Sequence, residues 1–133
     1  RAADPDIPVM VHIACGGQNE ESVYFFDKIL SRDVVFDVIG QSYYPQWHGT
    51  LDDLRCNLDD LAARYNKPVI VVEYREHRRE VNEIVRDVPG KMGLGTFIWE
   101  ATSPRWGGLF DRNGAANEHM KIYPEFLANY PSD

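Results

Sequence analysis

The chain has 133 residues, 44% of them hydrophobic, which is enough apolar material for one domain-sized core but not for two. Its formal charge is -7 and it has no basic run, so a nucleic-acid surface is not expected, because phosphate contacts need clustered Lys and Arg. No apolar stretch approaches the roughly 20 residues of a membrane-spanning helix, and residues 1–5 are not followed by the apolar core of a signal peptide. These features predict a single domain over residues 1–133, with no membrane span and no signal peptide in this chain.

Four apolar runs rich in β-branched residues recur at intervals of roughly thirty residues. Each is followed by a polar turn and then by a stretch with helical spacing. Strands that are buried on both faces show such near-continuous Val and Ile, rather than a clean alternation of polar and apolar residues. The predicted strands cover residues 9–14, 36–42, 68–73 and 94–99.

The segments between these strands carry helix signals. Asn19 is placed to cap a first helix, and Thr50 stands three residues before Asp53, in the spacing of a capping box. A third helix has apolar residues at helical spacing until Pro89 ends it. A last helix, over residues 118–130, is compatible with Pro124 only if that proline lies in its first turn.

Strict alternation of strand and helix predicts a parallel sheet with right-handed crossovers. Four such units make half of an eight-stranded barrel, which takes about 250 residues when complete. An open four-stranded sheet has two unpaired edges and an uncovered face, which favours association with another chain. The continuous apolar run 69–72 therefore predicts a homo-oligomer, with two half-barrels closing on each other.

The sequence offers no sign of a disulfide, a metal site or a cofactor. Cys15 follows a predicted strand and Cys56 falls on the polar side of a predicted helix, so both are expected to be free thiols. His12 and His48 have no third ligand at a zinc-like spacing. The adjacent glycines at 16–17 and 107–108 do not form a phosphate-binding fingerprint.

The residues that can carry chemistry follow the predicted strands, at the ends where α/β folds gather their functional groups. Two carboxylates, several aromatic rings and hydrogen-bonding His and Tyr at one rim are what a sugar-cleaving cleft requires. Aromatic rings cover the apolar faces of pyranose rings, and carboxylates act as acid, base or nucleophile. The candidates are His12, Tyr43, Tyr44, Trp47, His48, Glu73, Trp99 and Glu100.

Strand geometry constrains the most important of these candidates. Tyr43 and Tyr44 are adjacent on an extended run, so only one of them can point into the barrel. That tyrosine is expected to donate a hydrogen bond to Glu73 on the neighbouring parallel strand, although the sequence does not say which one it is. Period-two alternation places Val69, Val71 and Glu73 on one face. The competing arrangement turns Glu73 outward, towards an arginine on the helix side.

Several of these residues also have an ordinary structural interpretation. Glu73 can simply emerge into solvent at the end of its strand, and Glu100, which alternates with Trp99, is better explained as a structural ion-pair partner. Trp99 can fill the core or act as a sugar platform. Trp47 lies in a loop where core packing is less natural, which favours binding, and for Trp106 both interpretations stay open.

Four segments resemble glycoside hydrolase family 53, the arabinogalactan endo-β-1,4-galactanases. Residues 37–54, which contain Tyr-Tyr-Pro-Gln-Trp-His-Gly, are similar to the sixth strand, the aromatic loop and the start of the following helix in that family. Residues 71–73 look like the seventh-strand motif that ends in the nucleophile. Residues 93–100 look like the eighth strand, and residues 109–114 look like the segment beyond it.

The resemblance implies a (β/α)8 TIM barrel, of which this chain covers strands five to eight. It also implies a retaining endo-β-1,4-galactanase that acts on plant cell-wall galactan, in a secreted, periplasmic or cell-surface location. Glu73 is then the nucleophile. The substrate-binding residues are then His12, Tyr43, Tyr44, Trp47, His48 and Trp99.

The departures from the family pattern matter as well. The acid/base glutamate of the family follows an Asn at the end of strand four, and neither Asn19-Glu20 nor Asn82-Glu83 occupies such a place. The segment between Glu73 and Gly93 lacks the long loop that holds calcium in some bacterial members. We therefore expect the chain alone to be inactive. The alternatives are a carbohydrate-binding or structural half-barrel that self-associates, and another clan-A hydrolase with a different sugar specificity.

Overall fold

A computed structural model describes residues 3–105 and 107–129 of the chain. Trp106, whose role the sequence left open, lies outside the described residues. The chain divides into two compact units, Arg1–Phe97 and Ile98–Asp133.

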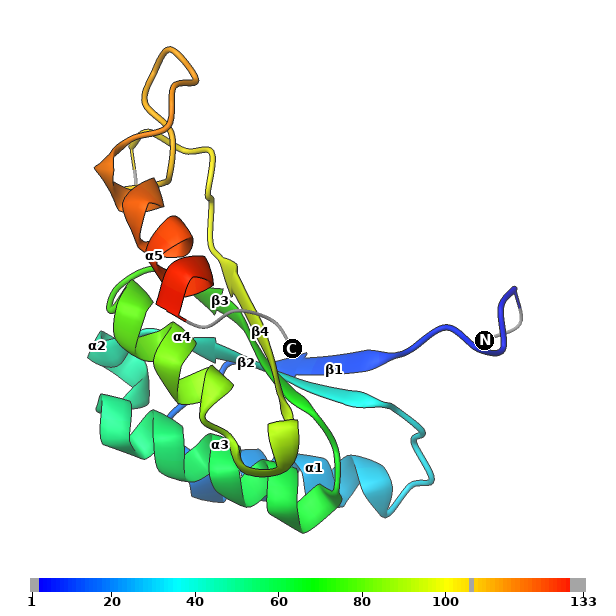
Figure 1. Cartoon of the computed structure of the whole chain (residues 1–133). Coiled ribbons are helices and arrows are strands. Elements are labelled where there is room, and N and C mark those ends of the chain that lie inside the picture. The colour runs from blue at the N-terminus through cyan, green and yellow to red at the C-terminus, as the bar shows by residue number, and fades with distance from the viewer. Residues whose placement is uncertain (1–2, 106, 130–133) are drawn as a thin grey trace. The chain divides into compact units, whose positions relative to one another are not determined.

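The first unit is built on a sheet with the strand order β1-β2-β3-β4 (Figure 1). The pairs β1–β2 and β2–β3 are parallel, with His12 opposite Gly40 and Ser42 opposite Glu73. The four predicted strands are confirmed, each with ends that move by one or two residues. Their bounds are Met10–Ile13 for β1, Val38–Tyr43 for β2, Val69–Tyr74 for β3 and Gly93–Ile98 for β4.

Three helices pack on one face of this sheet (Figure 1). They are α1 (Asn19–Leu30), α3 (Leu51–Tyr65) and α4 (Arg78–Arg86), and a short helix, α2 (Pro45–His48), follows β2. The core lies between helices and sheet because the apolar side of each helix meets the Val and Ile side chains of the strands. Fully buried core residues include Phe26, Phe36, Ile39, Leu54, Leu58, Leu61, Val69, Val71 and Val81.

The predicted N-terminal cap is confirmed for α3 and is wrong for α1. The capping box of α3 is present: the Asp53 N–H donates to Thr50 Oγ1 (3.2 Å) and the Thr50 N–H donates to Asp53 Oδ2 (2.8 Å). The Thr50 hydroxyl, which donates to Asp53 Oδ2 (2.7 Å), and the Thr50 N–H both lower the pKa of Asp53. Asn19 does not cap α1, whose N-cap residue is Gln18. Asn19 Nδ2 instead donates to Asn57 Oδ1 (3.1 Å), so its side chain ties α1 to α3.

The second unit is mostly loop and ends in helices. In it an isolated bridge joins Phe110 to Ala116, and a 3-10 turn, Glu118–Lys121, leads into α5 (Ile122–Asn129), whereas the 3-10 turn Pro89–Lys91 precedes β4 in the first unit. The helix α5 begins four residues later than the predicted helix, so that Pro124 is its third residue and lies in its first turn.

Two further sequence predictions concern the cysteines and membrane-spanning helices. Both cysteines, Cys15 and Cys56, are free thiols, as predicted. None of the helices in the described residues is long and apolar enough to cross a membrane.

Candidate active site

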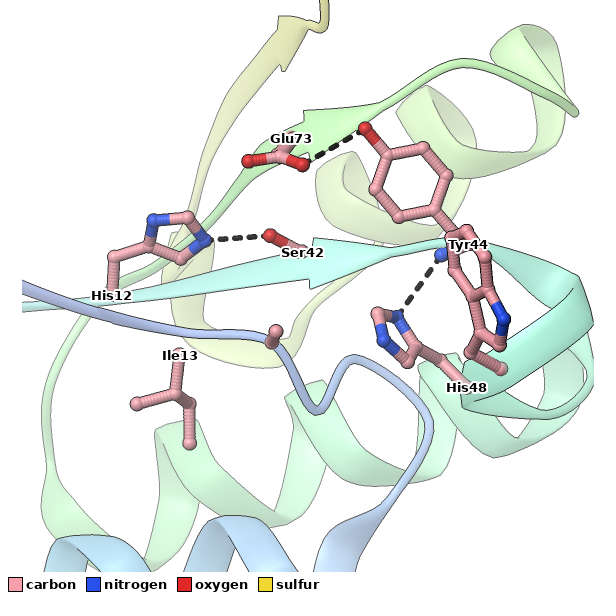
Figure 2. A pocket seen from close by; sticks show the side chains of 8 residues that line it. His12, Ile13, Ser42, Tyr44, His48 and Glu73 are labelled. Atoms are coloured by element: carbon pink, nitrogen blue, oxygen red, sulfur yellow. Dashed lines mark hydrogen bonds between the residues drawn. The ribbon is translucent and has the colours of Figure 1, made fainter.

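A pocket lies at the carboxyl ends of the first three strands (Figure 2). It is an open cavity of about 370 Å³, and the segments that follow β1 and β2 form much of its wall. All of its lining residues belong to the first unit. They are His12, Ile13, Ala14, Ser42, Tyr44, Trp47, His48 and Glu73.

A β-bulge turns Glu73 towards this pocket. Gln41 pairs with Val71, but the next residue, Ser42, pairs with Glu73, so Val72 is an extra residue in β3. In an unbroken pleat Val72 would pair with Ser42, and alternation would place Glu73 on the face opposite to Ser42. The bulge restores Glu73 to the same face as Ser42, and bulges next to functional sites commonly re-aim a side chain in this way.

The prediction that Val69, Val71 and Glu73 share one face is therefore wrong. Val69 and Val71 are fully buried on the helix side, whereas Glu73 lines the pocket. The residue after it, Tyr74, returns to the helix side, where its hydroxyl accepts a hydrogen bond from Asn82 Nδ2 of α4 (2.8 Å). Strict alternation failed because it cannot represent an unpaired residue.

Tyr44 is the tyrosine that holds Glu73. Its hydroxyl donates to Glu73 Oε1 at 2.9 Å, as Figure 2 shows, so the predicted hydrogen bond from a neighbouring strand end is confirmed. The Tyr44 side chain is 7% exposed. Burial and the bond to Glu73 raise the pKa of Tyr44 well above its usual value, so the phenol stays protonated and remains a donor.

Tyr43 lies away from the pocket, contrary to the prediction that it contacts a sugar. It is 1% exposed, and its hydroxyl donates to the Gly49 carbonyl oxygen (3.1 Å). Since successive side chains of a strand point to opposite faces, a pocket-facing Tyr44 requires Tyr43 to face the helices. Tyr43 is therefore a core residue.

His12 reaches the pocket from β1 and is paired there. Its Nε2 lies 2.6 Å from Ser42 Oγ, and the ring remains exposed (Figure 2). Ser42 was not singled out from the sequence. The signal was available, because parallel pairing of the two strands places the end of β2 beside His12.

The aromatic loop folds into the short helix α2, which the sequence did not predict. Trp47 is 66% exposed, and its ring packs edge-on against Tyr44 with 5.6 Å between the centroids. His48 is only 6% exposed, and its Nδ1 accepts a hydrogen bond from the Tyr44 backbone N–H (3.1 Å). Burial lowers the pKa of His48, with the Ser42 carbonyl and Glu73 acting in the opposite direction.

The other two candidates, Trp99 and Glu100, belong to the second unit. Trp99 is exposed, and Glu100 is exposed with a left-handed backbone (φ 49°). Among the residues that line the pocket, Glu73 is the single carboxylate. Within residues 3–105 and 107–129, no group of three His, Cys, Asp or Glu side chains is arranged to hold a metal ion.

A parallel β/α sheet with a carboxylate and aromatic rings at the carboxyl ends of its strands is the arrangement of a TIM-barrel glycoside hydrolase site. The fold is of (β/α)8 barrel type, with about four β/α units in this chain. The profile of glycosyl hydrolase family 53 matches residues 1–80. The chain belongs to this family.

Known proteins with similar sequences include an "Uncharacterized protein in bgaB 5'region" of Niallia circulans, 38% identical over 139 residues. The arabinogalactan endo-beta-1,4-galactanase A of Aspergillus niger is 35% identical over 131 residues. These matches cover 80% and 74% of this chain. The chain spans about a third of the length of these curated relatives, 37% and 36% respectively.

Two solved structures are also similar. The Ignisphaera aggregans GH53 catalytic domain has a TM-score of 0.78 and 26% identity, and the match covers 92% of this chain and 47% of that one. A structure from a report on two fungal beta-1,4-galactanases has the same TM-score at 21% identity, covering 91% of this chain and 48% of that one, and shows the fold alone.

Proposed function

We propose that the protein containing this chain is a retaining endo-β-1,4-galactanase and that Glu73 is its nucleophile. The observation that carries the proposal is the Tyr44–Glu73 hydrogen bond, in a pocket that also presents Trp47 and His12. The names of the Aspergillus relatives support galactan as the substrate. Because galactan is a cell-wall polysaccharide that lies outside the cell, we also propose a secreted or cell-surface location.

In the proposed reaction, one oxygen of Glu73 attacks the anomeric carbon while a second carboxylic acid protonates the leaving glycosidic oxygen. The glycosyl–enzyme ester is then hydrolysed by water, which the second carboxylate activates as a base. The Tyr44 hydroxyl donates to Oε1 of Glu73, which holds the carboxylate in one orientation. The exposed ring of Trp47 provides a platform for a pyranose ring, and His12 offers hydrogen bonds to sugar hydroxyls. Trp99 is a further proposed sugar contact.

The retaining mechanism requires a second carboxylate about 5–5.5 Å from the first. Glu73 is the single carboxylate among the residues that line the pocket. We propose that residues outside this chain supply the acid/base group and that the chain alone does not hydrolyse galactan. Robust turnover by the pure chain, lost in Glu73→Gln, would contradict this part of the proposal.

The test of the nucleophile uses the native protein that contains this chain. Glu73→Gln should lower the kcat for galactan by roughly 10³-fold or more, because the amide cannot form the ester. Glu76→Gln is the matched control, since Glu76 is an exposed carboxylate three residues further on. A 2-fluoro galactoside with a good leaving group should label the peptide that contains Glu73.

Two results would contradict the nucleophile assignment: a label on a different carboxylate, or an active Glu73→Gln variant. Binding of galactan without turnover by the native protein would favour the alternative of a carbohydrate-binding half-barrel.

The chain alone is also proposed to self-associate through its open sheet. Three large apolar side chains are exposed on the two edge strands of the sheet: Met10 on β1, and Leu94 and Phe97 on β4. Monomeric proteins rarely expose extended apolar patches. Light scattering should therefore show dimers or larger species at micromolar concentration, and a stable monomer would contradict the proposal.

A further inference from the structure

We propose that His48 is a positioning residue: as the neutral Nε2–H tautomer it fixes Tyr44, and through Tyr44 it fixes the carboxylate of Glu73. The structural part of this inference stands on the geometry of the pocket. Its catalytic consequence rests on the proposed function, because it needs Glu73 to be the nucleophile.

Two hydrogen bonds tie His48 to Tyr44 across the turn that begins α2. The Tyr44 N–H donates to His48 Nδ1 (3.1 Å), and the His48 N–H donates to the Tyr44 carbonyl oxygen (2.9 Å). The two rings also pack edge-on, with 6.1 Å between their centroids. Figure 2 shows the three residues in sequence: His48 holds the backbone of Tyr44, and the Tyr44 hydroxyl reaches Glu73.

The hydrogen bond to Nδ1 determines the tautomer. A ring nitrogen that accepts from a backbone N–H carries no proton, so neutral His48 must carry its proton on Nε2. A second proton would place an N–H on Nδ1 facing the Tyr44 N–H, and the bond would be lost. His48 is 6% exposed, so water cannot readily replace the missing partner. The low exposure also explains why burial lowers the pKa of this imidazole.

The surroundings of His48 are formed by several elements. A Cβ added at Gly17, in the loop after β1, would lie 1.9 Å from the His48 carbonyl oxygen, so this loop packs directly on the His48 backbone. The titratable groups that act on the ring are Glu73 of β3 and Tyr44, whose ring packs edge-on against it, and His12 of β1 lines the same pocket. Asp53 of α3 also lies close to Gly17, with its Cβ 3.2 Å from the position of an added Gly17 Cβ. These contacts leave His48 little freedom to move independently of the pocket.

A pair of variants separates the acceptor from the ring. In His48→Asn, the side-chain oxygen replaces Nδ1 as an acceptor for the Tyr44 N–H. In His48→Phe, an aromatic ring of similar shape remains, but the acceptor is lost. If His48 acts through its acceptor, the Asn variant keeps the position of Tyr44 better than the Phe variant does. If only packing matters, the order is reversed.

The experiment uses the native protein that contains this chain, with ¹⁵N-labelled histidine. Imidazole ¹⁵N spectra should show His48 as the Nε2–H tautomer at neutral pH. The ring should still be neutral below pH 6.5, which is the ordinary pKa of histidine. The signal is assigned by its loss in His48→Asn. Hydrogen exchange of the Tyr44 N–H should be slow in the wild type, nearly as slow in His48→Asn, and faster by roughly 10-fold in His48→Phe.

Turnover of galactan adds the catalytic readout. The kcat should fall by roughly 10-fold in His48→Phe, with a smaller change in KM, and should be higher in His48→Asn than in His48→Phe. An Nδ1–H tautomer, or unchanged Tyr44 exchange in His48→Phe, overturns the inference. The spectra and the exchange rates do not require activity, so a failure of the proposed function leaves them interpretable.

Discussion

The hydroxyl of Tyr44 can be removed without disturbing its ring, which makes Tyr44→Phe a direct test of how Glu73 is held. The bond is 2.9 Å long and joins a neutral donor to a carboxylate. Hydrogen bonds to charged groups contribute about 1.5–3 kcal/mol. Because each 1.36 kcal/mol corresponds to a tenfold change in rate, the loss predicts a fall in kcat/KM of roughly 10-fold to 150-fold.

The assay is hydrolysis of galactan by the native protein that contains this chain, and Tyr43→Phe is the matched control. Tyr43 is the preceding residue, and its hydroxyl donates to the Gly49 carbonyl oxygen (3.1 Å), on the side away from the pocket. Tyr43→Phe should lower the free energy of unfolding by about 1 kcal/mol and leave turnover close to the wild type. Equal losses of turnover in the two variants, or no loss in Tyr44→Phe, would refute the reasoning.

Two further predictions concern stability. Thr50→Ala removes the side-chain acceptor of the α3 capping box and should lower the free energy of unfolding in urea by about 1 kcal/mol, whereas Thr50→Ser should keep most of it; equal losses would contradict the capping role. Gly17→Ala places a Cβ 1.9 Å from the His48 carbonyl oxygen and should lower the melting temperature, because backbone must shift. Because the backbone of Gly17 is not left-handed, alanine adds no backbone strain there, and the close contact alone should lower the melting temperature. An unchanged melting temperature would therefore show that this loop does not pack on the His48 carbonyl.

The strands were predictable because their signal is local. The predicted strand 68–73 contains the continuous Val and Ile run 69–72, and β3 begins and ends within one residue of the predicted bounds. The capping box of α3 was predictable for the same reason, since Thr50 and Asp53 are three residues apart. The Tyr44–Glu73 bond needed one further step, the parallel pairing of neighbouring strands, which the alternation of strands and helices supplied.

The features that were missed depend on partners far away in the sequence. Asn19 has the composition of a helix cap, but its amide is used by Asn57 of α3, 38 residues away. The bulge in β3 depends on which residue of β2 lies opposite Val72, and nothing within β3 itself encodes that. The choice between Tyr43 and Tyr44 followed from the same register. Local patterns thus predicted the elements, and tertiary pairing decided which side chains reach the pocket.

The bulge in β3 has a consequence for how the chain tolerates length changes. Deleting Val72 would remove the bulge and leave Glu73 directly after Val71, still opposite Ser42, so its carboxylate would keep facing the cavity. If Val72 were kept but paired with Ser42 in an unbroken pleat, Glu73 would instead turn to the side where Tyr74 now sits and face the helices. Among proteins that share this sheet, a carboxylate two positions after a buried valine at the end of the third strand therefore faces the cavity only if its strand carries the extra residue.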